Sequence, residues 1–317
     1  ILKNVSEAKD LAKEMGYPVM LKATAGGGGR GMRLVHQEKD LEHLYATASN
    51  EALNSFNNGD MYIEKFVQNP RHIEIQILAD SDGNVVSLGE RECSIQRRHQ
   101  KLIEEAPSPA VDEELRKKMG EAAVKGAKAV NYIGVGTIEF LLDKNKKFYF
   151  MEMNTRIQVE HPITEMVTGA DLIKQQIRMH AGKKFPKYLY NFKLRGHSIE
   201  CRINAENPDM NFAPSPLPIT SYHMPGGKGV RVDSHAYAGY KIPSQYDSLI
   251  GKMIVHSPNR EDAINRMERA LEETIIEGPK TTIPFHQKIM KNDKFRSGDF
   301  DTSFLESFEY NKKDQKK

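Results

Sequence analysis

Residues 136–161 read GTIEFLLDKNKKFYFMEMNTRIQVEH, and they contain two apolar segments around one polar turn. The segments at 136–142 and 147–153 have the length and composition of strands, and the turn at 143–146 holds only Asp, Asn and Lys. Two strands joined by so short a connection pair antiparallel, as a hairpin.

A second close pair of strands is predicted upstream of this hairpin. Residues 72–78 read HIEIQIL, in which isoleucines alternate with polar residues, so they predict a half-buried strand with one polar face. The turn Asp82-Gly83 follows, and the chain returns at 85–88. Because strands recur as close pairs, their order favours an α+β fold built on antiparallel strands over a doubly wound parallel sheet.

Composition limits the class of protein. The chain has 317 residues, 38% of them hydrophobic, which is enough for one elaborate domain or for two. Its formal net charge of +3 includes lysines at 312–317, a terminal run and not a binding stripe, so no nucleic-acid partner is expected. Cys93 and Cys201 form no CxxC pair, which favours a reducing, cytoplasmic setting. No apolar run approaches ~18 residues, so no membrane span is expected.

A glycine-rich tract, GGGGRG at 26–31, follows a short predicted strand that carries Lys22. The tract matches the spacing of a dinucleotide fingerprint, but a strand and not a helix follows it, and the Gly-Lys-Ser/Thr of a Walker A loop is absent. Backbone N–H groups of such a hairpin can fold over phosphates, with Lys22 supplying positive charge. The alternative is a flexible surface hairpin.

Glu139 and Glu152 lie symmetrically about the turn at 143–146, so hairpin pairing would place their carboxylates opposite one another. Like charges in that arrangement are destabilising, and a shared divalent cation would relieve the repulsion. Carboxylates together with the amide oxygen of Asn154 are ligands that magnesium prefers. The alternative is a shifted register in which one glutamate faces solvent.

Further polar residues follow the hairpin. Arg156, Gln158 and Glu160 alternate, so in an extended chain they would share one face that could bind a small planar anion and exchange its proton. An ordinary polar edge strand is the alternative. The run QRRHQK at 96–101 is either a solvated loop or a phosphate-neutralising patch, and Arg202, in an alternating strand, is most simply half of a salt bridge.

Several motifs taken together resemble those of the biotin carboxylase family. They are NPRH at 69–72, QRRHQK at 96–101, EMNTRIQVEHP at 152–162, ECRINAE at 200–206, GGKGVR at 226–231 and YDSLIGK at 246–252. The motifs occur in the order found in the family and with similar gaps. The resemblance extends from about residue 1 to about residue 305.

The resemblance implies an ATP-grasp fold, with a glycine-rich lid and an antiparallel-sheet body, followed by a biotin carboxylase C-terminal domain. The lid is expected at 1–66 and the body, with the metal and bicarbonate sites, at 67–181. The C-terminal domain is expected at 190–306 and a basic tail at 307–317.

The resemblance also implies roles for single residues. ATP would be held by Lys22, the backbone at Gly28 and Gly29, the hinge residues Glu64, Lys65, Phe66 and Val67, and by His72 and His99. Mg²⁺ or Mn²⁺ would be held by Glu139, Glu152 and Asn154. Bicarbonate would be bound by Lys101, Arg156, Gln158 and Val159. Glu160 would be the general base that deprotonates bicarbonate, and Arg202 would face biotin and stabilise its enolate form.

The implied activity is ATP-dependent carboxylation of biotin by bicarbonate, through carboxyphosphate. Biotin would be presented on a biotin carboxyl carrier protein, and carboxyltransferase subunits would complete an acetyl-CoA or other acyl-CoA carboxylase of fatty acid synthesis. A homodimer is expected for the full-length protein.

The chain departs from the family in two places. Ala25 stands where the family often has glycine. The family's N-terminal domain, which supplies another ATP-contacting lysine, has no counterpart in the chain, so the chain alone is expected to be a poor or inactive carboxylase. The alternatives are another ATP-grasp ligase, such as a carbamoyl-phosphate synthetase half, and a non-catalytic nucleotide-binding module.

Overall fold

The computed structural model describes residues 1–25 and 31–310, and the chain divides into two compact units, 1–68 and 69–317. The first unit holds a three-stranded antiparallel sheet of order β2-β1-β3 and two helices. Its elements are α1 (Val5–Met15), β1 (Val19–Ala23), β2 (Met32–Val35), α2 (Glu38–Phe56) and β3 (Met61–Lys65). The alternate β1 residues Val19, Leu21 and Ala23 are buried in a core shared with the helices. Lys22 therefore points to the other side of this small sheet.

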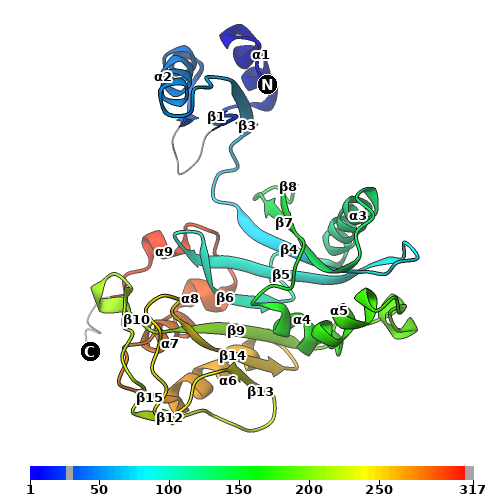
Figure 1. The fold of residues 1–317 in the computed structure, drawn as a ribbon, viewed down its shortest axis with the longest axis vertical. Coiled ribbons are helices and arrows are strands. Elements are labelled where there is room, and N and C mark those ends of the chain that lie inside the picture. Colours follow the sequence, from blue (N-terminus) through cyan, green and yellow to red (C-terminus); the bar gives the residue numbers. More distant parts are fainter. Residues whose placement is uncertain (26–30, 311–317) are drawn as a thin grey trace. The chain divides into compact units, whose positions relative to one another are not determined.

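The second unit is built on one eight-stranded sheet of order β13-β14-β9-β6-β5-β4-β7-β8 (Figure 1). All neighbouring strands in it are antiparallel, which confirms the predicted α+β class. The strands are β4 (Arg71–Ala79), β5 (Val85–Arg97), β6 (Gln100–Ala106), β7 (Gly134–Leu142), β8 (Phe148–Asn154), β9 (His197–Asn204), β13 (Val230–Ser234) and β14 (Leu249–Ser257).

This sheet runs through both regions expected in the second unit. Strands β4 to β8 belong to the expected body at 67–181, and β9, β13 and β14 belong to the expected C-terminal domain at 190–306. The two regions are joined by hydrogen bonds between β6 and β9. The domain boundaries themselves stay a prediction.

Helices cover both faces of the eight-stranded sheet. On one face, α3 (Glu113–Ala129) packs on the isoleucines of β4, while α6 (Arg260–Glu273) and α7 (Ile283–Met290) pack on β9 and β14. On the opposite face, α4 (His161–Thr168) contacts the central strands and α5 (Leu172–His180) packs on β4 and β7.

The polar side of β4 is covered as completely as its apolar side. The alternation at 72–78 predicts a half-buried strand, but Glu74 and Gln76 are each 0% exposed. They are covered because Arg91 from β5 bonds both of them and Thr164 of α4 bonds Arg91 in turn. A strand that is buried on both faces and polar on one of them marks the place where a site could lie.

The remaining elements are short and belong to the second unit. They are β10 (Glu206–Asn207), β11 (Ala213–Pro214), β12 (Ser221–His223), β15 (Ile275–Glu277), α8 (Asp293–Ser297), α9 (Phe304–Ser307) and the 3₁₀ turns Lys187–Tyr190 and Pro208–Met210. Within the described residues, no helix has the length and apolar character needed to cross a bilayer.

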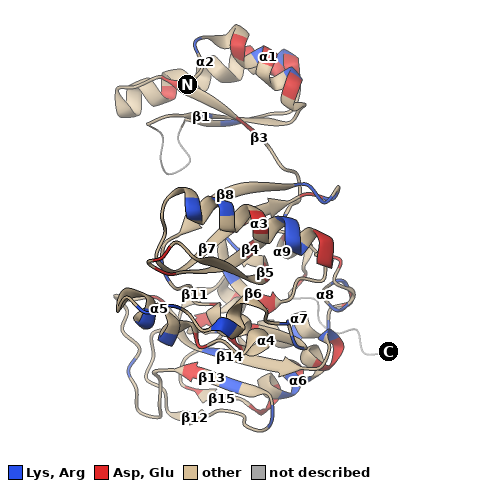
Figure 2. Ribbon diagram, turned by 90° about the vertical axis from the view of Figure 1, so that its right-hand side faces the viewer, with Lys and Arg blue, Asp and Glu red and all other residues tan. Residues whose placement is uncertain are grey.

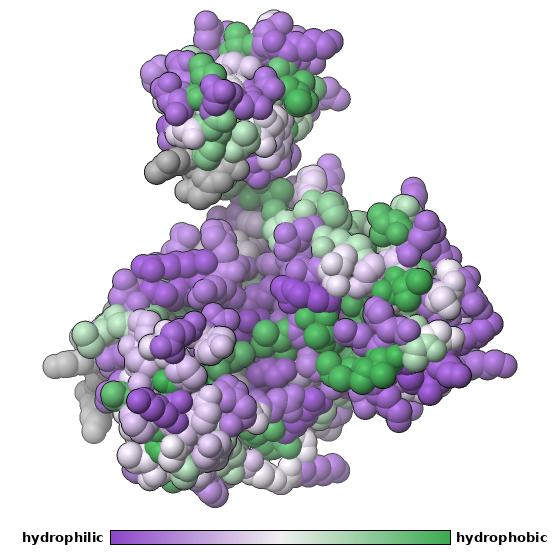
Figure 3. Space-filling view, viewed as in Figure 1, coloured by the Kyte–Doolittle hydropathy of each residue, from purple (hydrophilic) through white to green (hydrophobic). Residues whose placement is uncertain are grey.

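Surface charge and surface hydrophobicity are distributed differently. Lysines, arginines and acidic residues are mixed along the helices and loops (Figure 2). Apolar side chains are exposed at the end of α3 and along α5, at Val130, Ile133, Ile173 and Ile177, and Figure 3 shows hydrophobic atoms gathered over this part of the second unit.

Candidate active site

Lys101 lies at the centre of a cluster of buried carboxylates in the second unit. Its Nζ is 2.6 Å from Glu74 Oε2, 2.9 Å from Glu139 Oε1 and 2.7 Å from Glu160 Oε1. These carboxylates come from β4, β7 and the residue that precedes α4. Burial alone would lower the pKa of Lys101, but the surrounding carboxylates raise it well above its usual value, so the amine stays charged.

A β-bulge turns Lys101 towards this cluster. Ile95 pairs with Ile103 and the next residue of β5, Gln96, pairs with Lys101, so Leu102 is one extra residue on β6. Lys101 and Glu104, three positions apart, would face opposite sides of a regular strand. The extra residue lets both side chains reach the polar face, where Glu160 is bonded directly to Lys101 and, through Arg202, to Glu104.

Three carboxylates lie in a row across three strands. Glu74 of β4 is in register with Glu139 of β7, which is in register with Glu152 of β8, so the predicted pairing of Glu139 with Glu152 is confirmed. Burial alone would raise the pKa of Glu74, but Arg91 and Lys101 outweigh it and hold that pKa at about 2. Burial would likewise raise the pKa of Glu139, but His72 and Lys101 hold it at about 2. Both carboxylates are therefore ionised at neutral pH.

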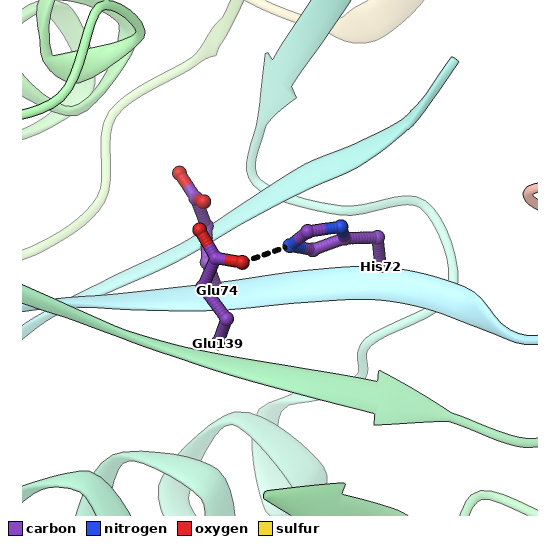
Figure 4. Close-up of side chains that lie close together, drawn as sticks. All are labelled: His72, Glu74 and Glu139. Atoms are coloured by element: carbon purple, nitrogen blue, oxygen red, sulfur yellow. Dashed lines mark ion pairs between the residues drawn. The ribbon is translucent and has the colours of Figure 1, made fainter. Parts of the chain in front are cut away.

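Glu139 is contacted from several sides. His72 Nε2 lies 2.9 Å from Glu139 Oε2, and the two side chains point towards one another with Glu74 beside them (Figure 4). The side chains of His72, Glu74 and Glu139 each offer one ligand atom, and those atoms lie within 4.8 Å of one another. Gln158 Nε2 donates to Glu139 Oε1 at 2.8 Å.

The donor set around Glu139 and Glu152 suits a hard divalent cation. Asn154 Nδ2 lies 3.0 Å from Glu139 Oε1 and 3.3 Å from Glu152 Oε1, so one amide group already bridges the two carboxylates. The nitrogen and oxygen of an amide exchange places by a half-turn, after which Asn154 would present an oxygen at the same position. Two carboxylates and an amide oxygen are the ligands that Mg²⁺ accepts.

Glu160 lies between two cations. Its Oε1 accepts from Lys101 and its Oε2 accepts from Arg202 Nη2 at 2.8 Å. Glu160 is the N-cap residue of α4 but its side chain caps no helix N–H, so the carboxylate is directed to the cluster. The prediction that Arg202 forms a salt bridge is confirmed twice over, since Arg202 Nε also donates to Glu104 Oε1 at 2.6 Å.

Two buried glutamates lie beneath Arg202. Glu104 of β6 is in register with Glu200 of β9, and both are 0% exposed. Burial raises the pKa of Glu104 to about 7 and raises that of Glu200 well above its usual range. Among the described residues neither carboxylate oxygen of Glu200 has a hydrogen-bond partner, so no donor offsets the burial that favours its neutral form.

Arg156 and His99 lie apart from this cluster. The alternation of Arg156, Gln158 and Glu160 predicts a shared face, but β8 ends at Asn154 and the chain then turns into α4. Gln158 and Glu160 reach the cluster, whereas Arg156 is exposed and donates to its neighbouring carbonyl, Ile157 O, at 3.2 Å.

The basic run at 96–101 also has some residues outside the cluster and one residue inside it. His99 is exposed at the tip of the β5–β6 hairpin. Arg97 lies 4.4 Å over the ring of Phe212 and donates to Asn211. Lys101 alone of its basic residues enters the cluster. The carbonyl oxygen of Val159 accepts from Lys252 Nζ at 2.7 Å, which brings β14 to the same place.

The candidate nucleotide-binding residues Lys22 and 64–67 belong to the first unit, and their contacts within that unit are as follows. Lys22 Nζ forms an ion pair with Glu64 Oε2 at 2.6 Å, and Lys65 Nζ donates to Gly16 O at 2.7 Å. Phe66 N donates to Pro18 O, and Val67 follows it near the end of the unit. Gly28 and Gly29 lie outside the described residues.

Sequence reasoning missed several members of the cluster. They are Glu74, Arg91, Glu104, Glu200 and Lys252. The available signal was weak: charged residues at alternating positions of apolar strands, which an exposed strand face also shows.

Two protein families match most of the chain. Residues 1–188 match the family described as carbamoyl-phosphate synthase L chain, ATP binding domain, and residues 200–307 match the biotin carboxylase C-terminal domain.

Individual proteins match over nearly the whole chain. A biotin carboxylase of Nostoc is 60% identical over 306 residues, covering 96% of the chain and 68% of that protein. Biotin carboxylase 1 of Bacillus subtilis is 56% identical over 310 residues, covering 98% and 69%. The biotin carboxylase domain dimer of Hydrogenobacter thermophilus 2-oxoglutarate carboxylase, solved with MgADP, ADP and bicarbonate, has a TM-score of 0.83 and 53% identity, covering 96% and 68%. The chain thus spans 68–69% of the length of these relatives.

Proposed function

Since the chain belongs to the biotin carboxylase family, we propose that it catalyses the ATP-dependent carboxylation of biotin by bicarbonate, as a ligase of the ATP-grasp fold. Bicarbonate loses its proton, and its oxygen bonds to the γ-phosphorus as ADP leaves, which gives carboxyphosphate. Carboxyphosphate then passes its carboxyl group to the ureido nitrogen of biotin, and the released phosphate takes up the proton that this nitrogen loses.

The position of Glu160 between Lys101 and Arg202 carries this proposal. Its carboxylate is 2% exposed and has a cation on each oxygen, at 2.7 and 2.8 Å. Cations at those positions attract an anion, and the carboxylate between them can take the proton of that anion. A bicarbonate ion beside Lys101 would therefore meet its base directly.

Other cluster residues complete the bicarbonate and biotin sites of the proposal. Gln158 and the backbone of Val159 lie beside Lys101 and Glu160 and would bind bicarbonate, with Arg156 turning inward from its exposed position. Arg202 would face biotin and stabilise its enolate form, because within residues 1–25 and 31–310 the guanidinium keeps N–H groups beyond its bonds to Glu104 and Glu160.

ATP and a divalent cation belong to the same proposal. Glu139, Glu152 and Asn154 would hold Mg²⁺ or Mn²⁺, which neutralises phosphate charge when bound. The nucleotide would be contacted by Lys22, Gly28, Gly29, Glu64, Lys65, Phe66, Val67, His72 and His99. The relative from Hydrogenobacter thermophilus, solved with MgADP and bicarbonate, supports this choice of ligands.

The partners are inferred from the same reaction. Biotin would arrive on a biotin carboxyl carrier protein, and carboxyltransferase subunits would use the product to carboxylate acetyl-CoA or another acyl-CoA. A homodimer of the full-length protein is part of the proposal, supported by the dimer of the relative from Hydrogenobacter thermophilus. A cytoplasmic location stays a prediction.

The test measures ADP formation by the purified full-length protein with and without bicarbonate and free biotin. We expect ATP cleavage to require bicarbonate and to rise with biotin, with carboxybiotin formed in step. Bicarbonate-dependent ATP cleavage whose rate does not change with biotin would favour the second candidate, another ATP-grasp ligase. The match of residues 1–188 to a carbamoyl-phosphate synthase domain supports that candidate. Tight nucleotide binding without turnover would favour a binding module.

A further inference from the structure

Arg91 of β5 is fully buried and is hydrogen-bonded to Gln158 of the proposed bicarbonate site. Its guanidinium is 0% exposed. Among the described residues it forms no hydrogen bond or ion pair with Lys101, Glu160 or Arg202, and it has no role in the proposed reaction. It does contact Gln158 and Glu74, which line the cluster.

Each N–H of Arg91 has its own acceptor. Nε donates to Glu74, Nη1 donates to Gln76 Oε1 at 2.5 Å and Thr164 Oγ1 at 3.0 Å, and Nη2 donates to Thr137 Oγ1 at 3.1 Å and Gln158 Oε1 at 3.0 Å. A guanidinium has five N–H donors, so none is left over. The acceptors come from β4, β7, α4 and the segment before α4, which fixes the plane of the guanidinium against all of them.

The contact with Gln158 sets the direction of its amide. A guanidinium only donates hydrogen bonds, so the amide atom that faces Arg91 must be the oxygen. The amide nitrogen of Gln158 then faces the other way, where it donates to Glu139 Oε1 at 2.8 Å. Gln158 therefore presents N–H donors to the Lys101 cluster, which suits a bound anion.

We propose that Arg91 is a positioning residue for bicarbonate: it holds the oxygen of the Gln158 amide, so that the amide nitrogen is presented to the anion beside Lys101. This inference rests on the proposed function. Arg91 acts through Gln158 and does not touch the substrate. Such a role predicts an effect on bicarbonate affinity that a merely structural role for Arg91 would not produce.

The test is Arg91→Lys in the purified protein. Lysine keeps a positive charge beside Glu74 but lacks the planar fork, so it cannot hold Gln158 and Gln76 together. We expect KM for bicarbonate to rise by about ten-fold or more, the size of one lost charge-assisted hydrogen bond. KM for ATP should stay within about two-fold, because the five hydrogen bonds of Arg91 go to Glu74, Gln76, Thr137, Gln158 and Thr164, and none of these is a proposed ATP residue.

The matched control is Thr164→Val, which removes an acceptor from the same guanidinium on the Nη1 side, away from Gln158. It should lower the melting temperature and leave KM for bicarbonate unchanged. An unchanged KM for bicarbonate in Arg91→Lys, or an equal rise in both variants, would overturn the proposal.

A second variant covers the case in which Arg91→Lys does not fold. Gln158→Glu keeps an acceptor for Arg91 but replaces the N–H donors with a carboxylate, so KM for bicarbonate should rise by about ten-fold or more while the protein stays folded. Wild-type KM for bicarbonate in Gln158→Glu would overturn the proposal. If the wild-type protein shows no bicarbonate-dependent ATP cleavage, the proposed function fails and not this inference alone.

Discussion

The two faces of β4 are equally closed to water but are built from opposite kinds of side chain. Its isoleucines pack beneath α3, and Glu74 and Gln76 lie on the other face, where Arg91 bonds both of them; all of these side chains are 0% exposed. On the first face any apolar side chain of similar volume would fit. On the second, each side chain has a named partner at hydrogen-bonding distance.

The two faces show how one strand can serve both stability and chemistry. Each buried isoleucine contributes about 1.5–3 kcal/mol, and volume-conserving changes are tolerated. A buried charge gains little over an apolar residue, yet removing its partner costs about 3–5 kcal/mol. The polar face therefore adds less stability than an apolar face would, and it is better explained by the reaction proposed for the cluster.

Glu160→Gln should show the largest effect on activity. An amide cannot take a proton, so bicarbonate-dependent turnover should fall by about 10²–10⁴-fold, as expected for loss of a general base. Steady-state ADP formation measures the loss, and nucleotide binding should be retained. Turnover within a few-fold of wild type would show that another group is the base.

Ile75→Ala should have the converse effect on the apolar face. Ile75 is fully buried beneath α3, and its truncation should lower the free energy of unfolding by about 2–5 kcal/mol. Ile75→Val, as the matched control, should cost about 0.5–1.5 kcal/mol. Urea unfolding measures both. Activity per folded molecule should match wild type, and a selective loss of turnover would contradict the separation of the two faces.

The polar face should lose stability at low pH. The pKa of Glu74 is about 2 in the folded protein and ordinarily 4.5, so its ion pairs stabilise the fold above pH 4.5 and are lost as the pH falls towards 2. The loss attributable to Glu74 is at most about 3 kcal/mol. Unfolding free energies between pH 5 and 2.5 should fall less steeply in Glu74→Gln than in wild type, and parallel curves would contradict the assignment.

Glu152→Ala should have the smallest effect, confined to the divalent cation. Glu152 is exposed at the end of the carboxylate row, so its loss should leave stability unchanged. The affinity for the magnesium–nucleotide complex should fall by about 10–100-fold, the size of one charge-assisted contact. Isothermal calorimetry with ADP and Mg²⁺ measures it, and unchanged affinity would remove Glu152 from the ligand set.

The parts of the fold that could be predicted are those with local causes. The turn at 143–146 and its two strands are contiguous, so their spacing predicts the pairing of Glu139 with Glu152. The partners of Arg91 lie 15 to 73 residues away along the chain. No window around Arg91 contains them, so its burial and its role in the cluster could not be predicted.

The remaining candidate residues needed the family resemblance. Lys101 has no local feature that distinguishes it from Arg97 in the same basic run, and the bulge that turns Lys101 towards the cluster depends on pairing between β5 and β6. The roles of the nucleotide, metal and bicarbonate residues stay predictions, because they concern bound molecules.

Because Leu102 is an extra residue, the site depends on the number of residues in β6 as well as on the identity of its side chains. Replacing Leu102 with another apolar residue keeps the count of residues between Lys101 and Glu104, and so keeps both on one face. Deleting it would restore a regular strand and reverse the direction of every side chain on one side of the gap. A single-codon deletion at this position would therefore separate the lysine from its carboxylates while every residue named in the site was still encoded.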